Sequence, residues 1–285
     1  MTGFTIPSHV PADLVRDFDF ADMRGGTDVY AHFAALHDGP DIIYTPHHGG
    51  HWVATRFADM EVILTDKIAF SSRHQTVPPM PITLTLIEWD GDLHADARKV
   101  LSPFFSPKSV SNLELVARDL TISLIDGFYE RGECDFVEEF ALKMPIIIVM
   151  SLMGLPDEDT PYLMQISEDI VRSTDPVVQA AAFQRVFDYI ANDVMPKRRA
   201  NPGRDIFSAI LDAKIEGGRP FTDAEIISFG AVLIAAGLDT VASTLGFLTE
   251  FLAENPNHRR ALVADPGLIN DAIEEMMRRF HIANI

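Results

Sequence analysis

An aspartate and a threonine stand side by side at the end of an otherwise apolar stretch. Asp239 and Thr240 follow residues 229–238, which carry no polar side chain. A buried carboxylate is costly unless it is hydrogen bonded or solvated. Gly237 precedes the pair and leaves room for another group near the backbone. Two interpretations are open: the pair moves protons, or Thr240 bonds the carbonyl of Ala236 while Asp239 faces outward.

Two further pairs of charged residues have helical spacing. His94 and Arg98 are four residues apart, so a helix aims both donors at one anion. Acidic neighbours leave open that they form ordinary surface ion pairs instead. Glu275 and Arg278 are three residues apart and can bind each other. An exposed pair of that kind contributes only a few tenths of a kcal/mol.

The helix that must position the aspartate and threonine is predicted from Thr222 to Asn255. Thr222 can cap the backbone N–H of Glu225, and Glu225 can reach back, which is a capping box. Asn255 precedes a proline, which ends the helix. At 1.5 Å per residue the helix is roughly 50 Å long. It must therefore cross the molecule, with its apolar middle in the core.

The rest of the chain predicts a mainly α protein with one small β-hairpin. Two short strands, Asp41–Tyr44 and Trp52–Thr55, flank a turn rich in glycine and histidine. The turn histidines lack the partners of a metal site, so no metal is expected there. Periodic apolar residues bounded by Gly, Pro or capping residues predict helices at 29–33, 57–65, 93–101, 113–129, 140–153, 161–173, 177–199, 257–264 and from 266 or 267 onward.

Composition excludes several classes of function. The net charge of −19 argues against nucleic-acid or anionic-membrane binding. The N-terminus has no signal sequence, and no run reaches the ~18 apolar residues of a spanning helix. The single cysteine, Cys134, permits no disulfide framework. We therefore expect one cytoplasmic domain over residues 1–285.

The connection over residues 77–87 is unusually apolar for a loop. An apolar loop must be buried against something, either a small core cluster of its own or a ligand. A ligand is the more interesting interpretation, because the loop then forms part of a binding pocket. Its apolar residues are Val77, Pro78, Met80, Ile82, Leu84, Leu86 and Ile87.

Taken together, the three pairs resemble motifs of cytochrome P450 monooxygenases. The run from Ala236 to Thr240 is similar to the oxygen-binding I helix, the His94–Arg98 pair to the HxxxR of the C helix, and the Glu275–Arg278 pair to the ExxR of the K helix. The motifs also occur in the family's order. From about residue 10 onward, the sequence resembles the bacterial camphor hydroxylase branch of this family. The similar segments are VPADLVRDFDF, GGHWVATRF, AFSS, LDTV, FLAENPNHR and EEMMRRF. The implied fold is the N-terminal part of the cytochrome P450 fold.

The resemblance implies a haem site on the long helix. Haem b is the expected cofactor, with His94 and Arg98 on its propionates and Ala236 and Gly237 against the ring. Thr240 would hydrogen-bond the oxygen being activated, and the aspartate beside it, Asp239, would relay protons from solvent. A local loosening of the helix is expected at this point. Glu275 and Arg278 would be buried as a structural pair.

The resemblance also implies a substrate pocket and redox partners. The pocket would combine the apolar loop with the long helix, through Ile82, Leu84, Ile87, Val232 and Ala235. Ile82 stands where the camphor hydroxylase branch has a tyrosine that binds a ketone, which argues against camphor itself. We expect a monomer that hydroxylates a small hydrophobic, terpenoid-like substrate. It would use O2 and electrons from a [2Fe-2S] ferredoxin and its reductase.

One expected element is missing from the sequence. The family's haem-ligating cysteine follows the ExxR motif, whereas this sequence ends at Ile285. Cys134 lies between Glu133 and Asp135, whose negative charges would disfavour a thiolate. We therefore expect no metal ligand in this chain, and no catalysis by these 285 residues alone. The alternatives are a truncated, non-catalytic P450 fragment or a haem-free helical protein that binds small molecules.

Overall fold

The computed structural model describes residues 5–22, 28–77, 83–171, 173 and 175–282. The chain forms two compact units. Unit 1 comprises residues 1–83 and 87–91, and unit 2 comprises residues 84–86 and 92–285. The single domain expected over residues 1–285 stays a prediction.

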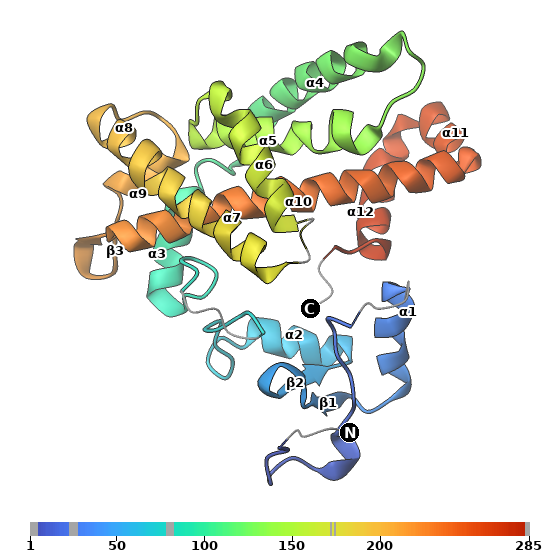
Figure 1. The fold of residues 1–285 in the computed structure, drawn as a ribbon. Helices are drawn as coiled ribbons and strands as arrows, with labels where there is room; N and C mark the ends of the chain where they lie inside the picture. Colours follow the sequence, from blue (N-terminus) through green and yellow to red (C-terminus); the bar gives the residue numbers. More distant parts are fainter. Residues whose placement is uncertain (1–4, 23–27, 78–82, 172, 174, 283–285) are drawn as a thin grey trace. The chain divides into compact units, whose positions relative to one another are not determined.

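Unit 1 is built around the predicted hairpin. Strands β1 (Ile42–Thr45) and β2 (His51–Ala54) pair antiparallel, with Ile42 opposite Ala54. The strands lie within one residue of the predicted ones. Its helical segments are η1 (Ala12–Leu14), α1 (Val29–Ala34), η2 (Ala35–Asp38), η3 (His47–Gly49) and α2 (Phe57–Thr65) (Figure 1).

The histidines of the β1–β2 turn bind carboxylates of the N-terminal segment. His47 Nε2 lies 2.7 Å from Asp17 Oδ1, and His48 Nε2 lies 2.7 Å from Asp19 Oδ1. These contacts tie the segment before α1 to the hairpin. Among the residues that the structure describes, no group of three or more His, Cys, Asp or Glu side chains is placed to hold a metal ion.

Unit 2 is almost entirely helical. Among its described residues, two π-helical turns interrupt the helices, and a hairpin with strands of two residues each precedes the longest helix. In chain order its elements are α3 (Gly91–Leu101), α4 (Pro107–Tyr129), η4 (Val137–Ala141), α5 (Lys143–Met153), η5 (Asp157–Asp159), α6 (Thr160–Val171), α7 (Pro176–Tyr189), η6 (Ile190–Val194), α8 (Met195–Ala200), α9 (Ile206–Asp212), β3 (Lys214–Ile215), η7 (Glu216–Gly218), β4 (Arg219–Pro220), α10 (Asp223–Glu254), α11 (Pro256–Ala264), η8 (Pro266–Leu268) and α12 (Ile269–Arg279).

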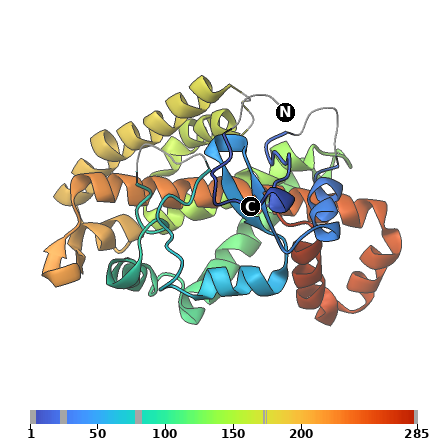
Figure 2. The same cartoon turned by 90° about the horizontal axis from the view of Figure 1, so that it is seen from below.

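Helix α10 is the centre of unit 2. It contacts α5, α6, α7, α9, α11 and α12, as well as both π-helical turns. Figure 2 shows it running unbroken past the other helices of the unit. Its buried residues include Ile226, Phe229, Ala231, Ile234 and Ala242. The prediction of a long central helix is confirmed.

Helix α10 begins with the predicted capping box. Thr222 Oγ1 accepts from Glu225 N at 3.3 Å, and Glu225 Oε2 accepts from Thr222 N at 2.7 Å. We expect Thr222→Ala to lower the free energy of unfolding by about 1 kcal/mol, because one helix-end N–H loses its acceptor. Urea denaturation measures this change. A Thr222→Ser variant keeps the hydroxyl and should stay near wild type; equal losses in both variants would contradict the capping account.

The Glu225 carboxylate makes the free energy of unfolding depend on pH. Arg219 donates two hydrogen bonds of 2.8 Å to Glu225, which lowers the pKa of this carboxyl below its ordinary 4.5. Because the folded pKa is the lower one, the unfolded state binds the proton more readily. The contribution is therefore complete above the ordinary pKa and is lost as pH falls through the lowered value.

We expect Glu225→Gln to be less stable than wild type at neutral pH and to lose less stability on acidification. Urea midpoints measured from pH 7 down to pH 3 test this expectation. The same change at the other end of α10, Glu254→Gln, is the control. Parallel pH profiles for wild type and Glu225→Gln would contradict the assignment.

The length and apolar composition of α10 also meet a criterion for membrane-spanning helices. Within the described ranges, α10 is the one helix long and apolar enough to cross a membrane, judged by length and composition. The sequence-based expectation used a stricter criterion, an uninterrupted apolar run of ~18 residues, and Ser228 and Asp239 bound the apolar run of α10. Core helices of globular proteins meet the broader criterion, and the contacts of α10 within unit 2 account for its apolar residues.

Three local features of unit 2 were not predicted. The π-helical turn η6 falls inside the helix predicted at 177–199, and η4 overlaps the start of the helix predicted at 140–153. Helix α9 and the β3–β4 hairpin were not assigned at all. By contrast, the loosening expected in the middle of α10 is absent from the described backbone, which is α-helical from Asp223 to Glu254. That expectation was wrong, because the helix is packed on several neighbours along its length.

Candidate active site

The middle of α10 presents a stripe of small and hydroxyl side chains. Val232, Ala236 and Thr240 are four residues apart and so lie on one side of the helix. Ala236 and Thr240 are exposed, whereas Val232 and the adjacent Ala235 are partly buried. The Thr240 hydroxyl donates a hydrogen bond of 2.7 Å to the Ala236 carbonyl. The helix thus has an open, narrow face within its most apolar part.

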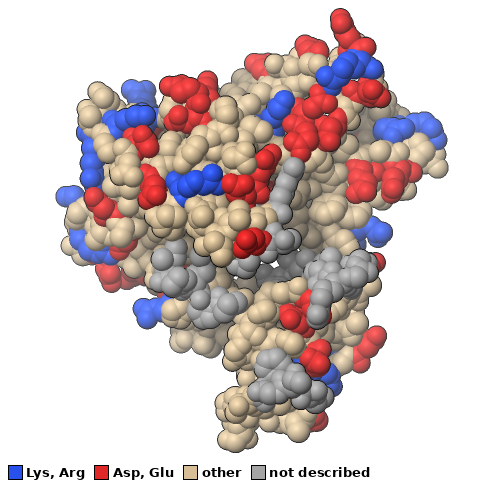
Figure 3. Space-filling model, viewed as in Figure 1, with Lys and Arg blue, Asp and Glu red and all other residues tan. Residues whose placement is uncertain are grey.

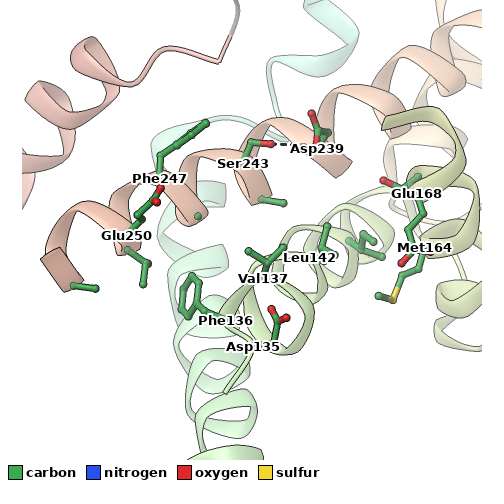
Figure 4. Close-up of a pocket in the computed structure, with 16 residues that line it drawn as sticks. Asp135, Phe136, Val137, Leu142, Met164, Glu168, Asp239, Ser243, Phe247 and Glu250 are labelled. Atoms are coloured by element: carbon green, nitrogen blue, oxygen red, sulfur yellow. Dashed lines mark hydrogen bonds between the residues drawn. The ribbon is translucent and has the colours of Figure 1, made fainter. Parts of the chain in front are cut away.

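Asp239 lies on a different side of the helix, beside a cavity. It is partly buried, and its Oδ1 accepts a 3.2 Å hydrogen bond from the Ser243 hydroxyl (Figure 4). The cavity has a volume of about 590 Å³ and lies among α10, α6 and the start of α5. It is lined by Asp135, Phe136, Val137, Leu142, Ile146, Met164, Ser167, Glu168, Asp239, Ala242, Ser243, Gly246, Phe247, Thr249, Glu250 and Ala253.

The two predicted catalytic residues therefore use different partners. Thr240 bonds backward to the helix backbone, as the simpler interpretation of the sequence held. Asp239 does not simply face solvent, because it lines the cavity and accepts a hydrogen bond from Ser243 (Figure 4). Carboxylates and hydroxyls at hydrogen-bond distance can hold and pass a proton. The arrangement suits a route from the cavity to the middle of α10.

Gly237 is a point of close helix packing. A Cβ on this residue would lie 2.2 Å from Cγ2 of Val149 on α5. The space beside the glycine is thus filled by a side chain of the protein. The close approach expected at Gly237 is thus made by Val149, and the contact of Gly237 with a cofactor stays a prediction.

The histidine and arginine of α3 share one face of that helix. His94 is partly buried and Arg98 is exposed. The neighbouring Asp96 is bound by Lys99 at 2.8 Å, and this hydrogen bond lowers the pKa of the Asp96 carboxyl. One ion pair on this helix therefore joins Asp96 to Lys99. The face that carries His94 and Arg98 can hold an anion with both side chains.

Glu275 and Arg278 pair as predicted but are not buried. Two hydrogen bonds of 2.7 Å join them, and these bonds lower the pKa of Glu275. Their side chains remain 62% and 72% exposed. The expectation of a buried pair is corrected, because in the described residues both side chains lie on the solvent side of α12. An exposed pair of this kind contributes little to stability.

The predicted substrate pocket stays a prediction, because its residues fall partly outside the described residues and in two units. Ile82 lies outside the described residues. Leu84 is partly buried and belongs to unit 2 with Val232 and Ala235, whereas Ile87 belongs to unit 1 and is 38% exposed. None of the four described residues lines the cavity beside the predicted proton relay. The cavity residues, among them Phe136, Met164 and Phe247, were missed by sequence analysis, because their segments are distant in the chain.

One contact to α10 could have been suspected from the sequence. Ser228 is a serine directly before the apolar run, and its hydroxyl accepts a 2.9 Å hydrogen bond from the backbone N–H of Thr85. A polar residue in a helix predicted to be buried signals a specific partner. The sequence could not identify that partner, because 143 residues separate the two.

Charge is spread over the surface seen in Figure 3. Acidic and basic side chains alternate there without one continuous basic area. Several arginines are already bound to carboxylates, including Arg199 to Asp223 and Arg219 to Glu225. This distribution fits the acidic composition of the whole chain.

Comparison with known proteins gives the family. No family model matches the chain. The chain is 33% identical over 300 residues to a probable cytochrome P450 127A1 of Sinorhizobium fredii, covering 98% of this chain and 70% of that protein. It is 34% identical over 216 residues to a steroid C26-monooxygenase of Mycolicibacterium smegmatis, covering 73% of this chain and 53% of that protein. The chain belongs to the cytochrome P450 family of monooxygenases.

Solved structures agree with this assignment. The crystal structure of CYP101J2 matches with a TM-score of 0.81 and 34% identity, covering 97% of this chain and 70% of that one. The crystal structure of cytochrome P450 CYP101C1 matches with a TM-score of 0.80 and 34% identity over the same shares. The predicted fold class, mainly α with the N-terminal part of the P450 fold, is confirmed.

The described residues fit one side of a haem. The exposed stripe at Ala236 and Thr240 has no bulky side chain, so a flat ring can approach the helix there. His94 and Arg98 are donors suited to propionates. The only cysteine of the sequence, Cys134, is exposed and lies just before η4. It is a free thiol between two carboxylates and does not fit the role of the iron ligand.

Proposed function

We propose that this chain, which spans 70% of its cytochrome P450 127A1 relative, is part of a haem-thiolate monooxygenase that hydroxylates a small hydrophobic, terpenoid-like substrate, with the iron-binding cysteine outside residues 1–285. Two observations support this proposal together: family membership and the position of Asp239 and Thr240 midway along the central helix. Related proteins carry names such as steroid C26-monooxygenase and erythromycin C-12 hydroxylase. Both names state oxidation at a single carbon of the substrate, which agrees with the proposed reaction.

The chain's own residues would supply binding and proton delivery. Haem, as haem b, would supply the oxygen-activating chemistry when bound. Ala236 and Gly237 would lie against the ring, and Val232 and Ala235 would form an apolar wall for substrate. Asp239 would take protons from the cavity through the Ser243 hydroxyl. Thr240, turned toward the open face, would donate its hydroxyl hydrogen to the reacting oxygen in place of the helix carbonyl.

We also propose a redox partner, an oligomeric state and a cellular location for the protein. Electrons would come from a [2Fe-2S] ferredoxin with its reductase, because the soluble bacterial proteins that this sequence resembles use such carriers. We propose a cytoplasmic monomer that binds neither nucleic acid nor membrane. The acidic composition supports the first of these exclusions, because nucleic-acid binding needs clustered positive charge.

Haem retention tests the proposed propionate contacts. We expect the double variant His94→Ala with Arg98→Gln to release haem at least tenfold faster than wild type, since hydrogen bonds to charged groups are each worth about 1.5–3 kcal/mol. Transfer of haem to apomyoglobin measures the rate. Lys99→Gln, on the same helix but bound to Asp96, is the matched control. Equal release from all three proteins would contradict the assignment of His94 and Arg98.

A second candidate function rests on the cavity beside α10. Its volume of about 590 Å³ lies within the range of small-molecule sites, roughly 300–1,000 Å³. A haem-free helical protein could bind a ligand there without any redox chemistry. The haem content of the purified protein separates this function from the first.

A further inference from the structure

One residue of the apolar connection, Thr85, is hydrogen bonded to α10. The backbone N–H of Thr85 donates a 2.9 Å hydrogen bond to the Ser228 hydroxyl. Thr85 is 2% exposed and Ser228 is 9% exposed, so the bond is shielded from water. A buried N–H needs a partner, because an unpaired one is costly. Ser228 therefore fixes the backbone of this connection at one point on the helix.

The next residue of the connection has a strained backbone. Leu86 has φ = 82°, a conformation that leucine rarely adopts. Its side chain is buried. A strained residue persists only where its surroundings hold it in place, and such residues concentrate at functional sites. Here the buried leucine side chain and the Thr85–Ser228 hydrogen bond are the contacts that hold it.

The attachment point lies on the stripe of α10 that carries the candidate site. Ser228, Val232, Ala236 and Thr240 follow one another at intervals of four residues. At 1.5 Å per residue, Ser228 is roughly 6 Å along the helix from Val232 and roughly 12 Å from Ala236. Leu84, beside Thr85, is partly buried in the same unit. The attachment thus lies one turn from the wall of the proposed pocket.

We propose that Ser228 is a positioning residue for substrate. By holding Thr85, it fixes Leu84 and the strained Leu86 against α10, so that the connection forms a firm apolar wall next to Val232. The ligand it favours is a hydrophobic molecule large enough to reach that wall. The attachment itself follows from the contacts alone, whereas its effect on ligand binding rests on the proposed haem function.

Amide exchange tests the attachment without any ligand. In Ser228→Ala the Thr85 N–H loses its acceptor, so its hydrogen exchange should accelerate about fivefold or more. Ser228→Thr keeps a hydroxyl and should restore protection. Ser111→Ala removes an exposed serine hydroxyl of α4 and should leave Thr85 unchanged. Unchanged exchange at Thr85 in Ser228→Ala would overturn the attachment.

Two azole ligands of the haem protein test the effect on the pocket. The affinity of imidazole depends on the haem alone, whereas the affinity of 4-phenylimidazole also depends on an apolar wall that contacts its phenyl group. We expect Ser228→Ala to weaken 4-phenylimidazole about fivefold with imidazole unchanged, and Ser228→Thr to bind both as wild type does. Faster exchange at Thr85 with unchanged binding of both azoles would overturn the positioning role. A protein that binds no haem would overturn the proposed function and, with it, the role of Ser228 in ligand binding. The amide exchange of Thr85 would still decide whether the connection is attached to α10.

Discussion

Asp239→Asn is expected to lower turnover about 100-fold, because general acid–base groups typically contribute 10²–10⁴-fold. Asparagine has nearly the same shape and can still accept the 3.2 Å hydrogen bond from Ser243. It cannot take up a proton at neutral pH. The loss should therefore fall on the rate of product formation. Steady-state turnover of the holoenzyme with its redox partners measures it.

The controls for this variant use the same cavity. Glu250→Gln changes another carboxylate of the lining and should leave turnover within about twofold of wild type, since that residue is one turn or more beyond Ser243. Substrate affinity and thermal stability of Asp239→Asn should also match wild type. Turnover of Asp239→Asn equal to that of Glu250→Gln would refute the proton route through Asp239.

Gly237→Ala is expected to destabilise unit 2 by about 1–3 kcal/mol, the usual range for overpacking a core. The new Cβ would lie 2.2 Å from Cγ2 of Val149, so α10 and α5 must separate or Val149 must change rotamer. Helix propensity alone would favour alanine by about 1 kcal/mol. The sign of the effect therefore decides whether packing or propensity dominates. Urea unfolding gives the free energy directly.

A matched variant of the same helix has the opposite expectation. Gly246 also lies in α10, but its Cβ would come no nearer than 4.0 Å to Val137 Cγ2. Gly246→Ala should therefore stabilise by about 0.5–1 kcal/mol. Adding Val149→Ala to Gly237→Ala should recover part of the loss, which a double-mutant cycle measures. Stabilisation by Gly237→Ala alone would show that the close approach to Val149 is unimportant.

Local signals were enough to predict much of the fold. The capping residues Thr222 and Asn255 predicted both ends of α10. The alternation around the glycine-rich turn gave the β1–β2 hairpin. These features depend on neighbouring residues, whose preferences are visible in the sequence. The π-helical turns were missed because they depend on how each helix packs on others.

The candidate site was only partly predictable, for a physical reason. The spacing of Ala236 and Thr240 places them on one stripe, but it cannot show that Asp239 turns to a cavity formed with α6. Likewise, the pairing of Glu275 with Arg278 follows from their spacing, whereas their exposure depends on what surrounds α12. The spacing of residues in the sequence predicts which side chains share one face of a helix. Contacts between segments that are distant in the chain depend on the fold.

The carbon monoxide difference spectrum of the reduced protein, purified from expression of its native gene, tests the central claim most directly. The proposal predicts a red-shifted Soret band of the thiolate type, since a cysteine thiolate on haem iron donates electron density to the metal. Folded protein without any haem signal would contradict the monooxygenase function. It would leave a protein of the cytochrome P450 family that binds a small molecule without haem.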